Sequence, residues 1–206
     1  MNGRVFSSNR LAVGCAMLMV PLMAASKSGG GDQALAESLA QESTRQAAIA
    51  SLAASGRTKV PLLLSWIKKS PRHIDGCAFL DGLMEALGEL KVKEAVPFLV
   101  QNISFRRGCA FSGSPWIRSP EFIERNFPAV GALVKIGPEA SRAVMAAFDR
   151  MADETDWRAA VFVVSEVSGV PEAPAFLESA LERANRDRYW AEDAIKRLNS
   201  VPSPAR

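Results

Sequence analysis

The sequence predicts an all-α fold, an α-solenoid of antiparallel helix pairs, on two main observations. Alanine and leucine dominate the chain, and aromatic residues make up only 7% of it. This composition favours helix over sheet, because strands prefer β-branched and aromatic side chains. Apolar residues also recur with the i, i+3, i+4, i+7 spacing of one helix face, starting at residues 60, 96, 141 and 173. Intervals of 36, 45 and 32 residues between these starts are typical of a solenoid whose repeat is a helix pair.

Each predicted pair ends in a second helix with one apolar face. The four faces are Val60, Leu63, Leu64 and Ile67; Val96, Leu99, Val100 and Ile103; Ser141, Val144, Met145 and Phe148; and Ala173, Phe176, Leu177 and Ala180. Proline follows the first position at Pro61, Pro97 and Pro174, whereas the third set has Arg142 there. Proline suits the first turn of a helix, where its missing N–H has no intrahelical partner. These positions are therefore expected to mark helix starts.

The first helices of the pairs are predicted from shorter apolar faces. These are Ile49 and Leu52; Leu80, Leu83 and Leu87; Val130 and Leu133; and Val161 and Val164. Turns at Gly56, Gly137 and Gly169 separate first from second helices, because glycine readily adopts the left-handed backbone that closes a helix. A last helix over residues 187–199, with Trp190, Ala194 and Leu198 on its apolar face, is expected to cap the array.

The ends of the chain are expected to lie outside this array. Residues 1–25 are typical of a signal peptide: Arg4 and Arg10 precede an uncharged apolar stretch at residues 11–25, too short for a membrane span of about 20 residues. We therefore expect an exported protein, periplasmic or extracellular; an uncleaved N-terminal anchor is the alternative. Residues 26–46 are predicted to form a flexible segment and first helix, and residues 201–206 a disordered tail.

Two stretches resemble a known repeat family. The sequence LMEALGELKVKEAVPFL at residues 83–99 is similar to HEAT-like repeats in their short, phycobilin-lyase-type form, and FPAVGALVKIGPEA at residues 127–140 resembles a second copy. The resemblance covers most of residues 47–198, which places a HEAT-like repeat domain at residues 47–200 with an insertion at 104–121. It implies a scaffold or binding surface, since few members are enzymes. It also implies that the second helices line the concave side, with polar residues Ser65, Lys68, Lys69, Gln101 and Asn102 near it.

Two of the three cysteines are candidates for a disulfide. Cys15 lies in the predicted signal peptide, which leaves Cys77 and Cys109, an even number for an exported protein. Cys77 falls at the start of one helix and Cys109 just after the end of its partner, and these ends lie side by side in an antiparallel pair. A bridge between them would stabilise the fold by roughly 3–4 kcal/mol. Two unrelated buried thiols are the alternative.

The insertion at residues 104–121 is the predicted partner-binding element. It combines basic and aromatic side chains, which are favoured in recognition loops, and no acidic residue occurs in it before Glu121. The candidate residues are Phe105, Arg106, Arg107, Phe111, Trp116 and Arg118. The alternative is that Phe111 and Trp116 only pack the loop onto the helices.

Catalytic, metal and cofactor sites are not predicted. His73 is the only histidine, which excludes histidine clusters for a metal. Asp81 and Glu85, at i and i+4, could serve acid–base chemistry, but we expect them on a solvated helix face. Removing the two arginines of the predicted signal peptide lowers the formal charge from +3 to +1, which argues against nucleic acid as a partner.

The sequence therefore favours an exported scaffold or protein-binding module without catalytic activity or cofactor. One alternative is a lyase-like or other ligand-binding enzyme on the same scaffold. Another is an accessory protein of an envelope complex, which would contact a membrane only if the N-terminal segment is retained as an anchor.

Overall fold

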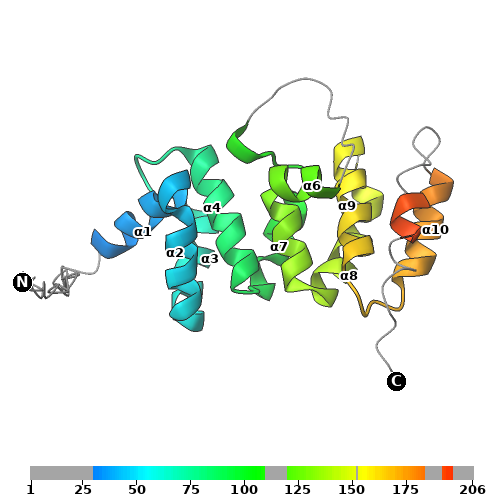
Figure 1. Ribbon diagram of the computed structural model, residues 1–206, viewed down its shortest axis with the longest axis horizontal. Helices are drawn as coiled ribbons and strands as arrows, with labels where there is room; N and C mark the ends of the chain where they lie inside the picture. Colours follow the sequence, from blue (N-terminus) through cyan, green and yellow to red (C-terminus); the bar gives the residue numbers. More distant parts are fainter. Residues whose placement is uncertain (1–29, 110–119, 152, 184–191, 197–206) are drawn as a thin grey trace, which may run out of the picture.

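The computed structural model describes residues 30–109, 120–151, 153–183 and 192–196, and these residues form an all-α structure without strands (Figure 1). The predicted all-α class is confirmed. The α-helices are α1 (Gly30–Ala40), α2 (Glu42–Ala54), α3 (Val60–Lys68), α4 (Gly76–Glu89), α5 (Val96–Gln101), α6 (Pro120–Asn126), α7 (Pro128–Ile136), α8 (Pro138–Ala147), α9 (Glu154–Glu166) and α10 (Ala173–Arg183). Short 3₁₀ turns accompany them: η1 (Gly56–Lys59), η2 (Lys93–Ala95), η3 (Arg107–Cys109) and η4 (Phe148–Arg150).

The helices follow one another along the long axis of the molecule in chain order (Figure 1). On one side α4 packs against α1, α2 and α3, and on the other it packs against α7. In turn α7 contacts α5, α6, α8 and α9, and α9 contacts α10. The described row is thus held together by contacts between helices up to three positions apart in chain order.

The second helices begin close to the predicted positions. Val60, Val96 and Ala173 are the first residues of α3, α5 and α10, and Pro61 and Pro97 lie in the first turns of α3 and α5. In the third pair the helix starts earlier than expected, at Pro138. Proline directly after a glycine turn fits a first helical position, so α8 gains three residues ahead of residue 141.

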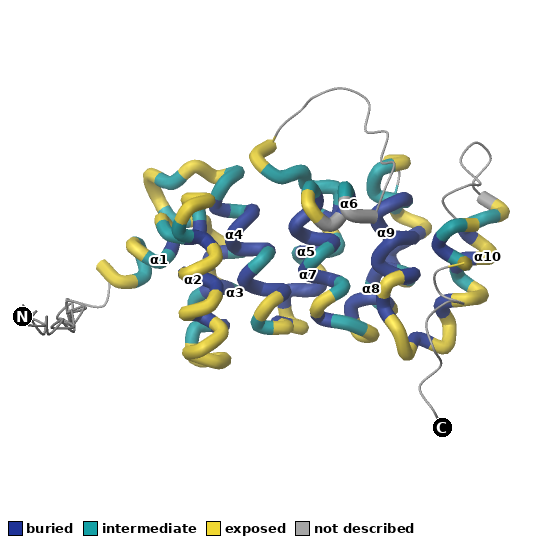
Figure 2. Tube along the Cα trace, viewed as in Figure 1, coloured by how far each residue is buried: buried dark blue, intermediate teal, exposed yellow. Residues whose placement is uncertain are grey.

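A continuous apolar core runs through the row of helices (Figure 2). Most residues of the predicted faces lie in it, whereas Leu64, Ile67, Val100, Met145 and Phe176 are only half-buried. Leu63, Leu99, Val144 and Leu177 are all fully buried. Burial of each such side chain contributes about 1.5–3 kcal/mol, so neighbouring pairs stabilise one another.

Glycine turns close three of the helix junctions as expected, and a lysine closes a fourth. The φ angles are +62° at Gly56, +90° at Gly137 and +79° at Gly169. After α4 the left-handed residue is Lys91, with φ +49°, and the next N–H donates back to the Leu87 carbonyl over 2.9 Å. This bond is the signature of a Schellman closure, formed here without glycine.

Both ends of the predicted array are seen in part. Residues 30–40 form α1, which contacts α2 and α4 and buries Ala36 and Leu39, so this part of the segment is a packed helix. Residues 192–196 are helical and bury Ala194, whereas Trp190 and Leu198 of the predicted last helix lie outside the described residues, as do residues 1–25 and 201–206. Within the described ranges, no helix is long and apolar enough to span a bilayer.

Candidate functional site

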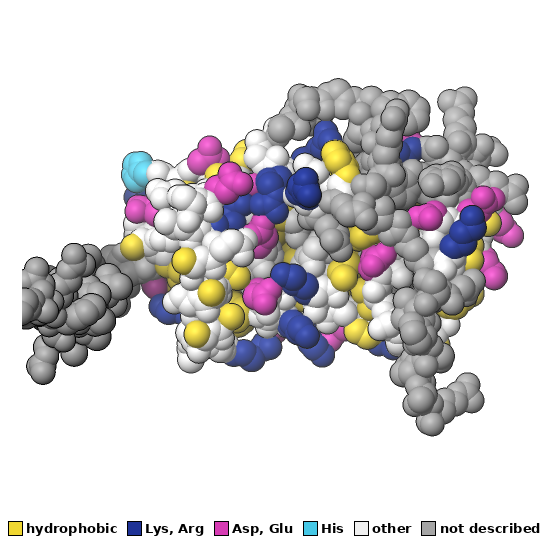
Figure 3. All heavy atoms as spheres, in the orientation of Figure 1, with side chains coloured by type: hydrophobic (Ala, Val, Ile, Leu, Met, Phe, Trp, Pro, Cys, Tyr) yellow, Lys and Arg dark blue, Asp and Glu magenta, His cyan; other side chains and the backbone are white. Residues whose placement is uncertain are grey.

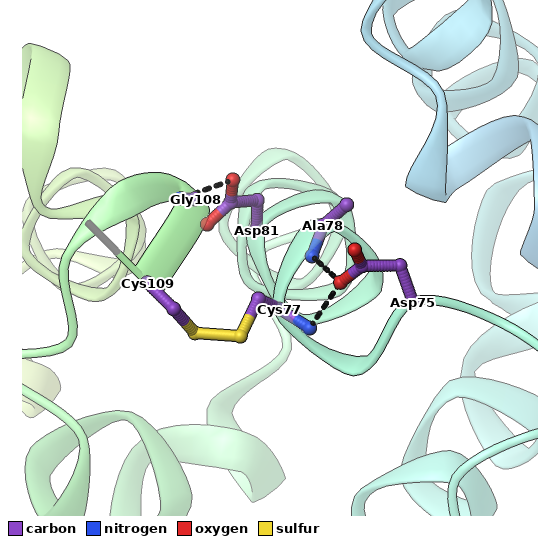
Figure 4. The surroundings of a disulfide bond; sticks show 6 residues. All are labelled: Asp75, Cys77, Ala78, Asp81, Gly108 and Cys109. Carbon is purple, nitrogen blue, oxygen red and sulfur yellow. Dashed lines mark hydrogen bonds between the residues drawn. A yellow bond between two sulfur atoms is a disulfide. The ribbon is translucent and has the colours of Figure 1, made fainter.

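Cys77 and Cys109 lie side by side at one end of α4, as predicted (Figure 4). Their Cα atoms are 5.7 Å apart and their sulfur atoms are within bonding distance, which is the geometry of a disulfide. Cys77 is in the first turn of α4, where the Asp75 carboxylate caps the helix by accepting hydrogen bonds from the N–H groups of Cys77 (2.9 Å) and Ala78 (3.1 Å). Cys109 ends the turn η3, with φ +48°.

Asp81 and Glu85 do not form the solvated face that the sequence suggested. The Asp81 side chain is 3% exposed and that of Glu85 17% exposed, because α2 and the turn η3 cover this face of α4. Arg45 of α2 lies between them, with its Nη1 3.9 Å from Asp81 Oδ2 and 3.8 Å from Glu85 Oε1. Arg107 of η3 forms a second ion pair with Glu85. We call these four residues the charge cluster.

Arg45 is held in place by backbone carbonyl groups as well as by the acids. Its Nε donates to the Leu39 carbonyl at 3.0 Å, where α1 ends, and its Nη2 donates to the Ala78 carbonyl at 3.2 Å. A buried charge is tolerated when it is paired and hydrogen-bonded in this way. The guanidinium therefore joins α1, α2 and α4.

The Asp81 carboxylate is only partly satisfied. Its Oδ2 accepts a hydrogen bond from the Gly108 N–H at 3.1 Å, drawn in Figure 4, whereas its Oδ1 is buried without a hydrogen-bond partner in the described structure. Burial raises the pKa of Asp81, and the Gly108 N–H, Arg107 and Arg45 act in the opposite direction. The ionised form of Asp81 thus depends on the turn that the disulfide holds.

The described residues of the insertion contact the rest of the chain at several points. Phe105 is half-buried against the core, and Arg106 lies over the rings of Phe122 and Phe127, 6.0 and 5.8 Å from their centroids. Besides its ion pair, Arg107 donates from Nε to the Arg125 carbonyl at 2.9 Å. Two arginines of the predicted binding element therefore have partners inside the chain.

The other three residues of that element, Phe111, Trp116 and Arg118, lie outside the described residues. The partner-binding hypothesis for the insertion stays a prediction.

An open groove between α5 and α8, which the sequence analysis did not predict, has a volume of about 590 Å³. It is lined by Pro97, Val100, Gln101, Ala143, Ala146, Ala147, Arg150, Met151 and Asp156. The three alanines present no atoms beyond Cβ toward the groove, which leaves the space between the helices open. The lining is mainly apolar, with one basic and one acidic side chain, a composition typical of ligand-binding clefts.

The groove and the charge cluster are separate sites, because Asp81 and Glu85 do not line the groove. Among the described residues, no group of three or more His, Cys, Asp and Glu side chains is placed to hold a metal ion. On the face drawn in Figure 3, Lys and Arg side chains are interspersed with Asp and Glu.

Comparison with protein-family models, curated proteins and solved structures gave no match to this chain. The resemblance to HEAT-like repeats stays a prediction.

Proposed function

We propose that this chain is an exported helical-repeat protein of the HEAT-like solenoid type, and that it binds a partner protein through the groove between α5 and α8. The observation that supports this most is the groove itself, because both of its main walls are second helices of consecutive predicted pairs. Binding between adjacent repeats is how solenoid folds commonly present an extended surface.

The lining indicates the chemistry of the partner. Val100, Ala143 and Ala147 offer apolar surface to apolar side chains of a bound segment. Arg150 is exposed and makes no ion pair in the described part of the chain, so its charge is available to a ligand. Asp156 lies in the first turn of α9, where the helix dipole offsets part of its negative charge. The segment that fits best is therefore an apolar peptide with an acidic residue.

The position of the acids favours binding over catalysis. An enzyme site of the lyase-like kind would need perturbed acids in its cleft. Asp81, the buried acid whose pKa is raised, is part of the charge cluster and does not line the groove. Asp156 is the carboxylate among the described residues that line the groove.

Binding can be tested with two synthetic peptides of 12 residues that share leucines at i, i+3 and i+7 and carry either glutamates or lysines between them. We expect the acidic peptide to bind at least about tenfold more tightly in fluorescence anisotropy titrations, and Arg150→Glu to reverse this preference. A preference that Arg150→Glu does not change, or no binding of either peptide, contradicts the proposal.

A bulky substitution in the groove provides the matched test of location. Ala143→Trp fills the groove from α8 and is expected to abolish peptide binding. Ala50→Trp adds the same side chain at an exposed position of α2 and is expected to leave binding unchanged. Equal effects of the two substitutions would place the binding surface elsewhere.

Export has its own test, because the anchored and released forms differ in mass. Intact-mass spectrometry of the protein from its native cell is expected to show a chain that begins near residue 26. A full-length chain in the membrane fraction would support the envelope-complex alternative instead.

A further inference from the structure

We infer that the Cys77–Cys109 disulfide is a reducible latch on the charge cluster, and that opening it makes the stability of the fold strongly dependent on pH. In the closed state, the turn η3 supplies Arg107 to the half-buried Glu85 and the Gly108 N–H to the buried Asp81. This inference is independent of the proposed binding function.

The contacts on either side of the disulfide show what the latch holds. Residues 107, 108 and 109 are consecutive, and each is tied to α4: Arg107 to Glu85, Gly108 to Asp81 and Cys109 to Cys77. Only the last tie is covalent. The side chain of Arg107 is 32% exposed, so water competes for its ion pair.

The backbone of the turn opposes the closed state once the covalent tie is cut. Cys109 is left-handed, with φ +48°, a conformation that a residue with a Cβ atom rarely adopts, whereas Gly108, with φ +65°, adopts it without strain. A Cβ on Gly108 would meet no atom within 4 Å, so packing does not enforce the turn there. Reduction of the disulfide therefore favours movement of the turn η3 away from α4.

The latch opens by thiol–disulfide exchange with a dithiol reductant. Cys109 is exposed and Cys77 half-buried, so the reductant thiolate attacks the Cys109 Sγ. The sulfur–sulfur bond breaks, and its electron pair goes to the Cys77 Sγ, which takes up a proton. The second thiol of the reductant then resolves the mixed disulfide, which frees Cys109 as a thiol and leaves the reductant oxidised.

The charge around Asp81 and Glu85 changes when the turn η3 moves away from α4. Asp81 is faced by Arg45 from α2, by Arg107 from η3 and by Glu85 on its own helix. With the turn in place, two arginines face two carboxylates. Without it, the two carboxylates share Arg45 alone, and Asp81 also loses the Gly108 N–H. Ionisation of the acids then becomes more costly in the open state than in the closed state.

The pH dependence separates this latch from an ordinary cross-link. A cross-link stabilises by restricting the unfolded chain, an effect that does not involve protons. Loss of Arg107 and the Gly108 N–H, which both lower the pKa of Asp81, instead raises the pKa of this buried acid in the folded open state. The stability lost on opening must then grow as pH rises above the ordinary carboxyl range.

The test compares urea denaturation of the oxidised full chain with that of the Cys77→Ser/Cys109→Ser variant at pH 4.0 and 7.0. We divide the unfolding equilibrium constant of the serine variant by that of the oxidised chain. This ratio is expected to be at least about tenfold larger at pH 7.0 than at pH 4.0, which corresponds to a rise of one pKa unit in one carboxyl group. The same ratio at both pH values would reduce the disulfide to a simple cross-link and overturn the inference.

Two further variants assign the effect to the charge cluster. When Asp81→Asn is added to the Cys77→Ser/Cys109→Ser variant, the ratio of unfolding constants at pH 4.0 and that at pH 7.0 are expected to become much closer. Glu89→Gln, at an exposed acid of α4 paired with Lys135, is expected to leave their difference intact. Equal effects of the two substitutions would also overturn the inference.

A rate measurement keeps the inference testable if the serine variant does not fold at either pH. Arg107→Gln removes one tie of the turn, so dithiothreitol should reduce the disulfide of this variant several-fold faster than that of the wild type. Arg125→Gln, an exposed arginine nearby, should not change the rate. Equal rates for Arg107→Gln and the wild type would contradict the latch.

Discussion

Gly88 of α4 and Ala132 of α7 bring the two central helices into backbone contact. A Cβ atom on Gly88 would lie 2.5 Å from the Cα atom of Ala132, a separation that real Cβ atoms do not adopt. On the other side of α4, a Cβ atom on Gly82 would lie even closer to the backbone of Leu39 in α1. Glycine at both positions lets α4 approach a helix on each side.

Gly88→Ala is expected to destabilise the fold by about 3 kcal/mol, since the obstructing atom belongs to the backbone and cannot turn aside. Gly131→Ala, one residue from the contact in α7, meets nothing within 4 Å and should stabilise by about 0.5–1 kcal/mol through helix propensity. Urea denaturation of both variants measures the contrast. Similar stabilities would show that α4 and α7 are farther apart than described.

Lys91→Gly is expected to stabilise the protein by about 1 kcal/mol. Lys91 is exposed and left-handed at φ +49°, and glycine relieves the steric cost of that backbone. The thermal midpoint should rise by a few degrees. Lys93→Gly, in the neighbouring 3₁₀ turn without a positive φ, serves as the control and should lower it.

Leu99→Asp is expected to unfold the protein at ambient temperature. Leu99 is fully buried in α5, and an unpaired carboxylate there costs several kcal/mol on top of the lost apolar burial. Circular dichroism during heating provides the measurement. Gln101→Asp, an exposed position on the same helix, should melt near the wild type, and a wild-type melting curve for Leu99→Asp would remove that residue from the core.

Asp81→Asn should change how the stability of the oxidised protein depends on pH. Burial raises the pKa of Asp81 above its ordinary 3.8, so the folded state binds this proton more tightly than the unfolded state. The contribution of Asp81 to stability is therefore greatest at low pH and falls as pH rises from about 3.8 through the raised pKa. As pH rises from 3.5 to 7, the urea midpoint of Asp81→Asn should fall less steeply, or rise more, than that of the wild type.

Glu89→Gln provides a control of opposite sign. The hydrogen bond from Lys135 lowers the pKa of Glu89, so its contribution is present above the ordinary carboxyl pKa and is lost as pH falls. Because the Glu89–Lys135 pair is exposed, the change should be small. A matching response of the two variants would mean that Asp81 is not buried.

Local patterns predicted much of the fold. Apolar spacing and proline placed the starts of α3, α5 and α10, and glycine identified three turns, because each of these signals acts within a few residues. The closure at Lys91 was missed, since lysine has no turn preference that a sequence reveals. The early start of α8 was also missed, because the apolar template was aligned on residue 141 rather than on Pro138.

The candidate sites were less accessible to sequence reasoning. The proximity of Cys77 and Cys109 followed from the antiparallel order of one pair. Burial of Asp81 could not be foreseen, because it depends on coverage by Arg45 and by the turn at Gly108, which lie 36 residues before and 27 residues after it. The groove was missed because alanines on α8 look like ordinary helix formers; a run of small residues at 143, 146 and 147 was the available signal.

The helix α10 packs mainly against α9 and so forms the outermost layer of the described row. Its Phe176 ring packs against Phe148, with 4.8 Å between the ring centroids, and Phe148 stands between the groove residues Ala147 and Arg150. Loss of α10 would therefore remove a support of the groove together with the last layer of the described row, so this end of the row and the groove cannot change independently.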